Sequence, residues 1–217
     1  MKRWIVVMLT MVGMLLAAGC GSSGSSSSGD ANKDQGWSSG SGSQQAQSSQ
    51  APEGVQKGTG DGKTIVVYFS ATGNTKTLAT KAAKVLGADL YAITPAQPYT
   101  AKDLDYQDNN SRTSKERDDK NARPAIKGTV DLKPYTTVVL AYPIWWYEAP
   151  RIMNTFVSQV DLSGKKVIPI ATSGGSGIGQ SANILKDIGS PSAKWTQGRV
   201  FSPSVSDDEL GQWLKAQ

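Results

Sequence analysis

The stretch that decides the fold reads Ile65-Val66-Val67-Tyr68-Phe69-Ser70-Ala71-Thr72-Gly73-Asn74-Thr75. Its first five residues are apolar, as in a strand that is buried on both faces of a sheet. The residues that follow place Leu78, Ala82, Val85 and Leu86 at helical spacing. The stretch therefore predicts a strand, a short loop rich in hydroxyl groups, and a helix.

The loop at this junction, Ser70-Ala71-Thr72-Gly73-Asn74-Thr75, has the composition of a phosphate-binding loop. The first N–H groups of a helix have no partner within the helix, and the helix dipole favours an anion there. Ser and Thr hydroxyls add donors, and Gly73 lets the backbone approach a ligand. A nucleoside triphosphate loop would need Gly-Lys-Ser/Thr, but Asn74 follows Gly73. The alternative is a Ser or Thr that caps the helix and holds no ligand.

The composition excludes several kinds of chemistry. The 217 residues include one cysteine and no histidine, so disulfides within the chain, thiolate or histidine metal sites and Ser-His-Asp triads are excluded. The net charge is +5, and the basic excess falls to three without Lys2 and Arg3 of the leader. The sequence contains no basic run interleaved with aromatic residues, so nothing in it indicates a nucleic-acid partner. We identify no catalytic side chain and no metal ligand, so any chemistry is expected to come from a bound group.

The first 61 residues are predicted to lie outside the folded domain. Residues 1–19 have a basic start, an apolar stretch shorter than the ~20 residues of a spanning helix, and a small-residue end, which together indicate a signal peptide. The ending Ala17-Ala18-Gly19-Cys20 resembles a bacterial lipoprotein box, which implies lipidation of Cys20 and a membrane anchor on the extracytoplasmic face. An ordinary secreted protein with a spare thiol is the alternative. Residues 20–61, rich in Ser, Gly and Gln, are expected to form a disordered tether.

Residues 62–217 alternate between strand and helix patterns and predict a single α/β domain with a doubly wound parallel sheet. The stretch at 101–125 is strongly charged and is expected to be a solvated helix or excursion. The expected strands are at residues 64–69, 88–93, 136–142, 166–171 and 198–201. The expected helices are at residues 75–86, 150–160, 179–188 and 206–215.

A second candidate loop, Pro143-Ile144-Trp145-Trp146-Tyr147-Glu148-Ala149-Pro150, follows the strand at 136–142. Two adjacent Trp side chains at the end of a strand are costly to leave in water, so they are expected to cover something flat. That partner is either a ligand or the protein's own core, and the loop alone does not distinguish the two.

A third candidate loop, Thr172-Ser173-Gly174-Gly175-Ser176-Gly177-Ile178-Gly179, follows the strand at 166–171. Its glycines free the backbone to approach a ligand and to offer N–H groups. The dinucleotide fingerprint would require a glycine at Gln180, and a nucleophile elbow would require one at Ile178, so neither motif is present. A flexible loop without a ligand is the alternative.

All three loops leave the carboxyl ends of predicted parallel strands, which is the edge where open α/β sheets bind ligands. The first loop offers phosphate donors, the second aromatic faces and the third backbone N–H groups. Together they predict a site for a flat heterocycle that carries a single phosphate.

With these motifs, the sequence resembles the flavodoxins over about residues 63–217, and particularly the bacterial group with a Pro-Ile-Trp-Trp loop and a Thr-Ser-Gly-Gly-Ser-Gly loop. The resemblance implies a five-stranded sheet of order 2-1-3-4-5 and FMN bound without a covalent link. It implies that Ser70, Ala71, Thr72, Gly73, Asn74 and Thr75 hold the phosphate. Pro143, Ile144, Trp145, Trp146 and Tyr147 would contact the isoalloxazine, and Ser173, Gly174, Gly175, Ser176 and Gly177 would close on its polar side.

Tyr147 departs from the family pattern, which usually has glycine after the two tryptophans. In flavodoxins that glycine peptide can turn over near the flavin N5 and stabilise the half-reduced flavin. Because positive φ costs a residue with a side chain more than it costs glycine, we expect less stabilisation of the half-reduced flavin here, while FMN binding itself is not affected.

The resulting hypothesis is an FMN-binding electron-transfer protein of the cell membrane, lipid-anchored through Cys20 on the extracytoplasmic face. Its partner would be a redox protein or a small electron acceptor. Two alternatives remain at this point: an FMN-dependent oxidoreductase that reduces quinones or other small acceptors, and a non-redox ligand-binding module on the same fold.

Overall fold

The computed structural model describes residues 54–217. The expected signal peptide, Cys20 and most of the expected tether therefore lie outside the described residues. Within residues 54–217, no helix is long and apolar enough to cross a membrane.

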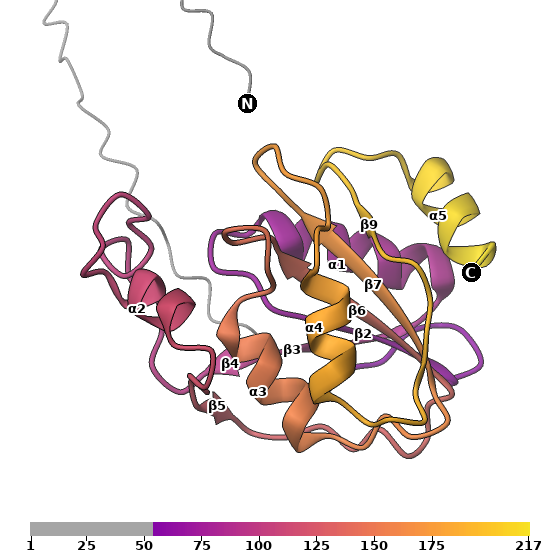
Figure 1. Ribbon diagram of the computed structural model, residues 1–217. Helices are drawn as coiled ribbons and strands as arrows, with labels where there is room; N and C mark the ends of the chain where they lie inside the picture. Colours follow the sequence, from indigo (N-terminus) through magenta and orange to yellow (C-terminus); the bar gives the residue numbers. More distant parts are fainter. Residues whose placement is uncertain (1–53) are drawn as a thin grey trace, which may run out of the picture. The chain divides into compact units, whose positions relative to one another are not determined.

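A central sheet of seven strands organises the domain (Figure 1). Its parallel core follows the spatial order β3-β2-β6-β7-β9, which is the predicted order 2-1-3-4-5 when these strands are counted along the chain. The prediction of a doubly wound parallel sheet is thus confirmed. The strands of this core are β2 (Thr64–Tyr68), β3 (Asp89–Ala92), β6 (Thr137–Pro143), β7 (Lys166–Thr172) and β9 (Arg199–Val200).

Helices cover both faces of the sheet, with α1 and α5 on one face and α3 and α4 on the other (Figure 1). Each begins and ends within two residues of its predicted range, because its apolar positions recur at helical spacing. Leu78, Ala82 and Leu210 are fully buried against the first face, and Ile152 and Met153 against the second. The bounds are α1 Asn74–Leu86, α3 Arg151–Gln159, α4 Ser181–Ile188 and α5 Asp207–Lys215.

The predicted last strand, 198–201, is only part of a broken edge. The two-residue strand β8 (Lys194–Trp195) pairs with the start of β7, and β9 pairs with its end. Backbone carbonyls of Val167 and Ala171 accept hydrogen bonds from this edge, so Pro169, which lies midway between them, faces the same side. Because proline has no N–H to donate, the ladder is interrupted at that point.

The ordered domain begins earlier than the predicted boundary at residue 62. Strand β1 (Val55–Gln56) pairs antiparallel with β3. The buried Asp89 carboxylate then accepts hydrogen bonds from the Gly58 N–H (2.7 Å), the Lys57 Nζ (2.8 Å) and the Tyr135 hydroxyl (2.6 Å). Burial works to raise the pKa of Asp89, but these three hydrogen bonds outweigh it and lower the pKa below its ordinary value. The expected disordered tether therefore does not extend over residues 55–60.

The charged stretch forms an excursion, residues 96–125, between β3 and β6. Its neck is a short antiparallel ladder of β4 (Thr94–Pro95) and β5 (Ile126–Lys127). It carries the short helix α2 (Arg112–Asp118), which begins where the Ser111 side chain accepts a hydrogen bond from the Ser114 N–H. Figure 1 shows α2 apart from the helices that cover the sheet. The excursion is thus the one large departure, among the described residues, from a minimal layered sheet.

Candidate functional site

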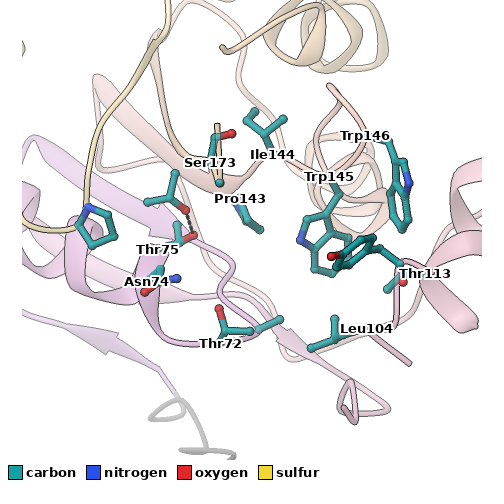
Figure 2. Close-up of a pocket in the computed structure, with 15 residues that line it drawn as sticks. Thr72, Asn74, Thr75, Leu104, Thr113, Pro143, Ile144, Trp145, Trp146 and Ser173 are labelled. Atoms are coloured by element: carbon teal, nitrogen blue, oxygen red, sulfur yellow. Dashed lines mark hydrogen bonds between the residues drawn. The ribbon is translucent and has the colours of Figure 1, made fainter. Parts of the chain in front are cut away.

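A cavity of about 460 Å³ lies at the carboxyl edge of the sheet and is lined by parts of all three predicted loops. This volume is in the range of small-molecule and cofactor sites. Figure 2 shows hydroxyl and amide side chains at one end, from Thr72, Asn74 and Thr75, and the two indoles of Trp145 and Trp146 at the other. The remaining lining residues are Ala71, Leu104, Tyr106, Thr113, Pro143, Ile144, Thr172, Ser173, Gly174 and Pro203.

The polar end of the cavity is built around the start of α1. Gly73 is the N-cap residue, with φ of 96°, and no side chain caps the helix. The alternative in which a Ser or Thr merely caps this helix is therefore wrong. A Cβ at Gly73 would meet no atom of the protein within 4 Å, so glycine is required by the positive φ and not by a close approach within the chain.

Hydroxyl groups surround this helix start. Ser70 Oγ accepts a hydrogen bond from the Gly73 N–H at 3.1 Å, which shapes the loop. Thr75, which is 1% exposed, shares a hydrogen bond of 2.7 Å with Thr172 across the floor of the cavity. The first N–H groups of α1 and the exposed Thr72 remain available to a ligand.

The aromatic end of the cavity is held by a cluster of rings. Trp145 meets Phe69 and Tyr99 edge to face, with ring centroids 5.8 and 5.6 Å apart. Because Trp145 both packs against these rings and lines the cavity, it combines the two roles that the sequence left open. Trp146 also lines the cavity, with the Arg117 guanidinium 4.9 Å from its ring. Burial, followed by the nearby Glu116 carboxylate, raises the pKa of Tyr99.

The third loop is folded onto itself. The Ser173 Oγ accepts hydrogen bonds from the N–H groups of Ser176 (2.8 Å) and Gly175 (3.2 Å). Only the beginning of this loop, Thr172, Ser173 and Gly174, lines the cavity. The polar groups that this loop offers to the cavity therefore lie directly at the end of β7.

Among residues 54–217, no charged side chain lines the cavity, and the first turn of α1 contains no acidic residue. An anion at the polar end would meet hydroxyl groups, N–H groups and the positive end of a helix dipole, without a carboxylate to repel it. The geometry thus suits a ligand with an anionic end and a flat apolar end.

The flavodoxin family model matches residues 63–217 of this chain. The chain belongs to the flavodoxin family. Two solved structures, both classed as flavoproteins, are similar to this flavodoxin domain. The protein from Bacteroides eggerthii is 46% identical over 71% of this chain and 96% of its own, with a TM-score of 0.67. The protein from Bacteroides uniformis is 43% identical over 71% and 98%, with a TM-score of 0.67.

A more distant structure shares the fold alone. It is a flavoprotein from Lactobacillus acidophilus in complex with FMN, 16% identical over 70% of this chain and 99% of its own, with a TM-score of 0.54. No curated protein matches the sequence.

The flavodoxin cavity brings together ten of the sixteen predicted site residues. These are Ala71, Thr72, Asn74, Thr75, Pro143, Ile144, Trp145, Trp146, Ser173 and Gly174. The other six lie in the same loops but do not line the cavity: Ser70, Gly73, Tyr147, Gly175, Ser176 and Gly177.

Five lining residues were not predicted. Thr172 and Pro203 follow from the edge rule, since one ends β7 and the other lies just beyond β9. Leu104, Tyr106 and Thr113 come from the excursion. The one sequence signal that could have indicated a binding residue there is Tyr106, an aromatic residue within a charged stretch. Their presence in the cavity depends on how the excursion folds back.

The backbone of the second loop holds Tyr147 at positive φ. Trp145 and Glu148 exchange two backbone hydrogen bonds, of 2.9 and 3.0 Å, around a two-residue turn. Both central residues have positive φ, 48° at Trp146 and 66° at Tyr147, as a type I′ turn requires. The flanking pair of hydrogen bonds therefore holds Tyr147 in the conformation that is costly for a residue with a side chain, and the expected effect on the half-reduced flavin stays a prediction.

Proposed function

We propose that this domain binds FMN in the cavity and acts as an electron-transfer protein. The observation that carries the proposal is a single cavity with uncharged anion donors at one end and two tryptophans at the other. When bound, FMN supplies the redox chemistry, because the lining side chains have none of their own.

The residues present fit such a cofactor. The start of α1 and Thr72 would hold the phosphate with N–H and hydroxyl donors, aided by the helix dipole. Trp145 and Trp146 would contact the ring, and the beginning of the third loop would meet its polar side. The Thr75–Thr172 hydrogen bond joins the start of α1 to the end of β7 within the cavity lining.

Electron transfer to a partner protein is favoured by exposed aromatic side chains beside the cavity. Tyr106 and Tyr147 are the large hydrophobic side chains exposed in the described domain, at 68% and 69%. Tyr106 lines the cavity and Tyr147 adjoins Trp146 in the chain. A redox partner could therefore approach the aromatic end of the cavity, where the flavin ring would lie and which we call the ring end.

We also propose that the protein acts at the cell membrane, on the extracytoplasmic face, through a lipid on Cys20. The support is the small-residue run that ends at the only cysteine of the chain. Residues 21–53 would then separate the lipid from the domain.

The cofactor is tested by titrating the chain that starts at Gly21 with FMN and with riboflavin, following flavin fluorescence. Thr72→Ala should weaken FMN binding about 10- to 100-fold, the value of a hydrogen bond to a charged group, and leave riboflavin unchanged. Thr80→Ala, at an exposed threonine of α1 outside the cavity, is the matched control and should affect neither ligand.

Two results would contradict the proposal. If the native chain binds neither flavin, the cofactor assignment is wrong. If Thr72→Ala weakens FMN and riboflavin equally, the phosphate does not lie at the start of α1.

A further inference from the structure

Arg151 is a buried cation in an unfavourable place for its own helix. It is the first residue of α3, and its side chain is only 6% exposed. Positive charges stabilise the carboxyl end of a helix and not its amino end. Arg151 does not line the cavity. Its burial must therefore be stabilised by partners outside α3.

Those partners lie at the end of α2. The Arg151 guanidinium donates from Nη2 to the Arg117 carbonyl (2.8 Å) and from Nε to the carbonyls of Glu116 (3.0 Å) and Asp119 (3.2 Å). The last carbonyl groups of a helix receive no hydrogen bond from an N–H group of the same helix, and they form the negative end of its dipole. The positive charge of Arg151 is thus unfavourable at the amino end of α3 and favourable at the carboxyl end of α2.

The remaining contact reaches the turn beside the cavity. Arg151 Nη1 donates to Glu148 Oε2 at 2.7 Å, and Glu148 closes the turn that presents Trp146. The end of α2 also reaches this turn through Arg117, whose guanidinium lies over the Trp146 ring. One guanidinium therefore joins the excursion to the positive-φ turn.

The excursion in turn carries the third wall of the cavity. Thr113, in α2, donates from both its N–H (3.1 Å) and its hydroxyl (2.7 Å) to the Asp103 carbonyl, and so fixes the adjacent Leu104. Thr113 and Leu104 both line the cavity. Hydrogen bonds from the Thr100 N–H and hydroxyl lower the pKa of Asp103 and keep it ionised in this turn.

A second link runs from α2 to Trp145. The Glu116 carboxylate accepts hydrogen bonds from Tyr99 and Arg112, both at 2.8 Å. Arg112 lies 4.0 Å from the centre of the Tyr99 ring, and that ring packs on Trp145. Movement of α2 would therefore disturb both the excursion wall and the aromatic end.

We propose that Arg151 is a positioning residue that clamps the excursion to the Trp145–Glu148 turn and so sets the shape of the ring end of the cavity. We name its contacts with Glu148 and the α2 carbonyls the Arg151 clamp. The effect on a ligand rests on the function proposed above, whereas the clamp itself does not. Arginine is required because a planar fork can serve four acceptors at once, which a lysine ammonium cannot.

The experiment compares Arg151→Lys with Arg199→Lys in the chain that starts at Gly21. Arg199 is a suitable control because it pairs with Glu209 on the surface and does not line the cavity. Arg151→Lys should weaken FMN and riboflavin by the same factor, about tenfold or more, because the ring end is common to both. Arg199→Lys should change neither affinity.

A second measurement needs no flavin. Trypsin should cleave the excursion of Arg151→Lys at least tenfold faster than that of the native chain, since cleavage tracks the population of the locally open state. The available sites are Lys102, Arg112, Lys115, Arg117 and Lys120, because Pro124 follows Arg123 and blocks cleavage there. Should the native chain bind no flavin, the proposed function fails while this measurement still decides the clamp.

Glu148→Gln provides an independent variant if Arg151→Lys does not fold. Glu148 is only half-buried, and the substitution keeps its shape but removes the charge that faces Arg151. It should weaken both flavins severalfold and by equal factors. Unchanged riboflavin affinity in both variants, or unchanged trypsin cleavage in Arg151→Lys, would overturn the proposal.

Discussion

Replacing Tyr147 by glycine should stabilise the protein, in contrast to the usual effect of glycine. Tyr147 has φ of 66°, a left-handed conformation that costs a residue with a Cβ about 1–2 kcal/mol. Its side chain is 69% exposed, so little burial is lost when the ring is removed. Tyr147→Ala is the matched control, because it also removes the ring but keeps the Cβ and the strained backbone.

The comparison between the two variants isolates the backbone. At an ordinary strand or helix position, alanine is more stable than glycine by roughly 0.5–1 kcal/mol. At Tyr147 we expect the reverse, with glycine more stable than alanine by about 1 kcal/mol, or roughly 2–4 °C in Tm for a chain of this size. Urea and thermal unfolding of the flavin-free chain, followed by tryptophan fluorescence, measure the difference. If Tyr147→Ala equals or exceeds Tyr147→Gly in stability, the positive-φ turn described here is refuted.

Three further predictions test other parts of the structure. The pKa of Asp89 is lower in the folded chain than in the unfolded chain, so the stability that its carboxylate provides is present above about pH 4 and is lost as the pH falls through the native pKa. Asp89→Asn should therefore flatten the fall of Tm in acid. An unchanged profile of Tm against pH would contradict this. Gly179→Ala should displace the second loop and weaken FMN and riboflavin alike, since a Cβ there would lie 2.7 Å from the Tyr147 carbonyl oxygen; unaltered binding would show that the loops are not coupled. Cys20→Ser should release the protein from the membrane fraction or leave it unprocessed, and continued partition into detergent would count against a lipid anchor.

The layered architecture and most of the cavity were predictable from local patterns. Apolar runs of strand length and apolar positions at helical spacing are properties of neighbouring residues, so they placed the four long helices within two residues of their observed bounds. The edge rule for parallel sheets then placed three loops together, because parallel strands necessarily end on the same side. For the layered sheet, local rules failed where a strand is short, as at β1 and at the broken edge opposite Pro169.

The sequence by itself determined which loops could bind a flat, singly phosphorylated ligand. The hydrogen-bonding capacity of a hydroxyl group, the backbone freedom of glycine and the flat apolar face of tryptophan are properties of each residue and do not depend on the fold. Tertiary structure alone decided how the ring end is closed. Arg151 donates to carbonyl acceptors 32 to 35 residues away in the chain, and Leu104 and Thr113 of the excursion line the cavity together with the three loops. A buried guanidinium must satisfy its donors with whichever acceptors the fold brings near, and that choice is not encoded in the residues beside it.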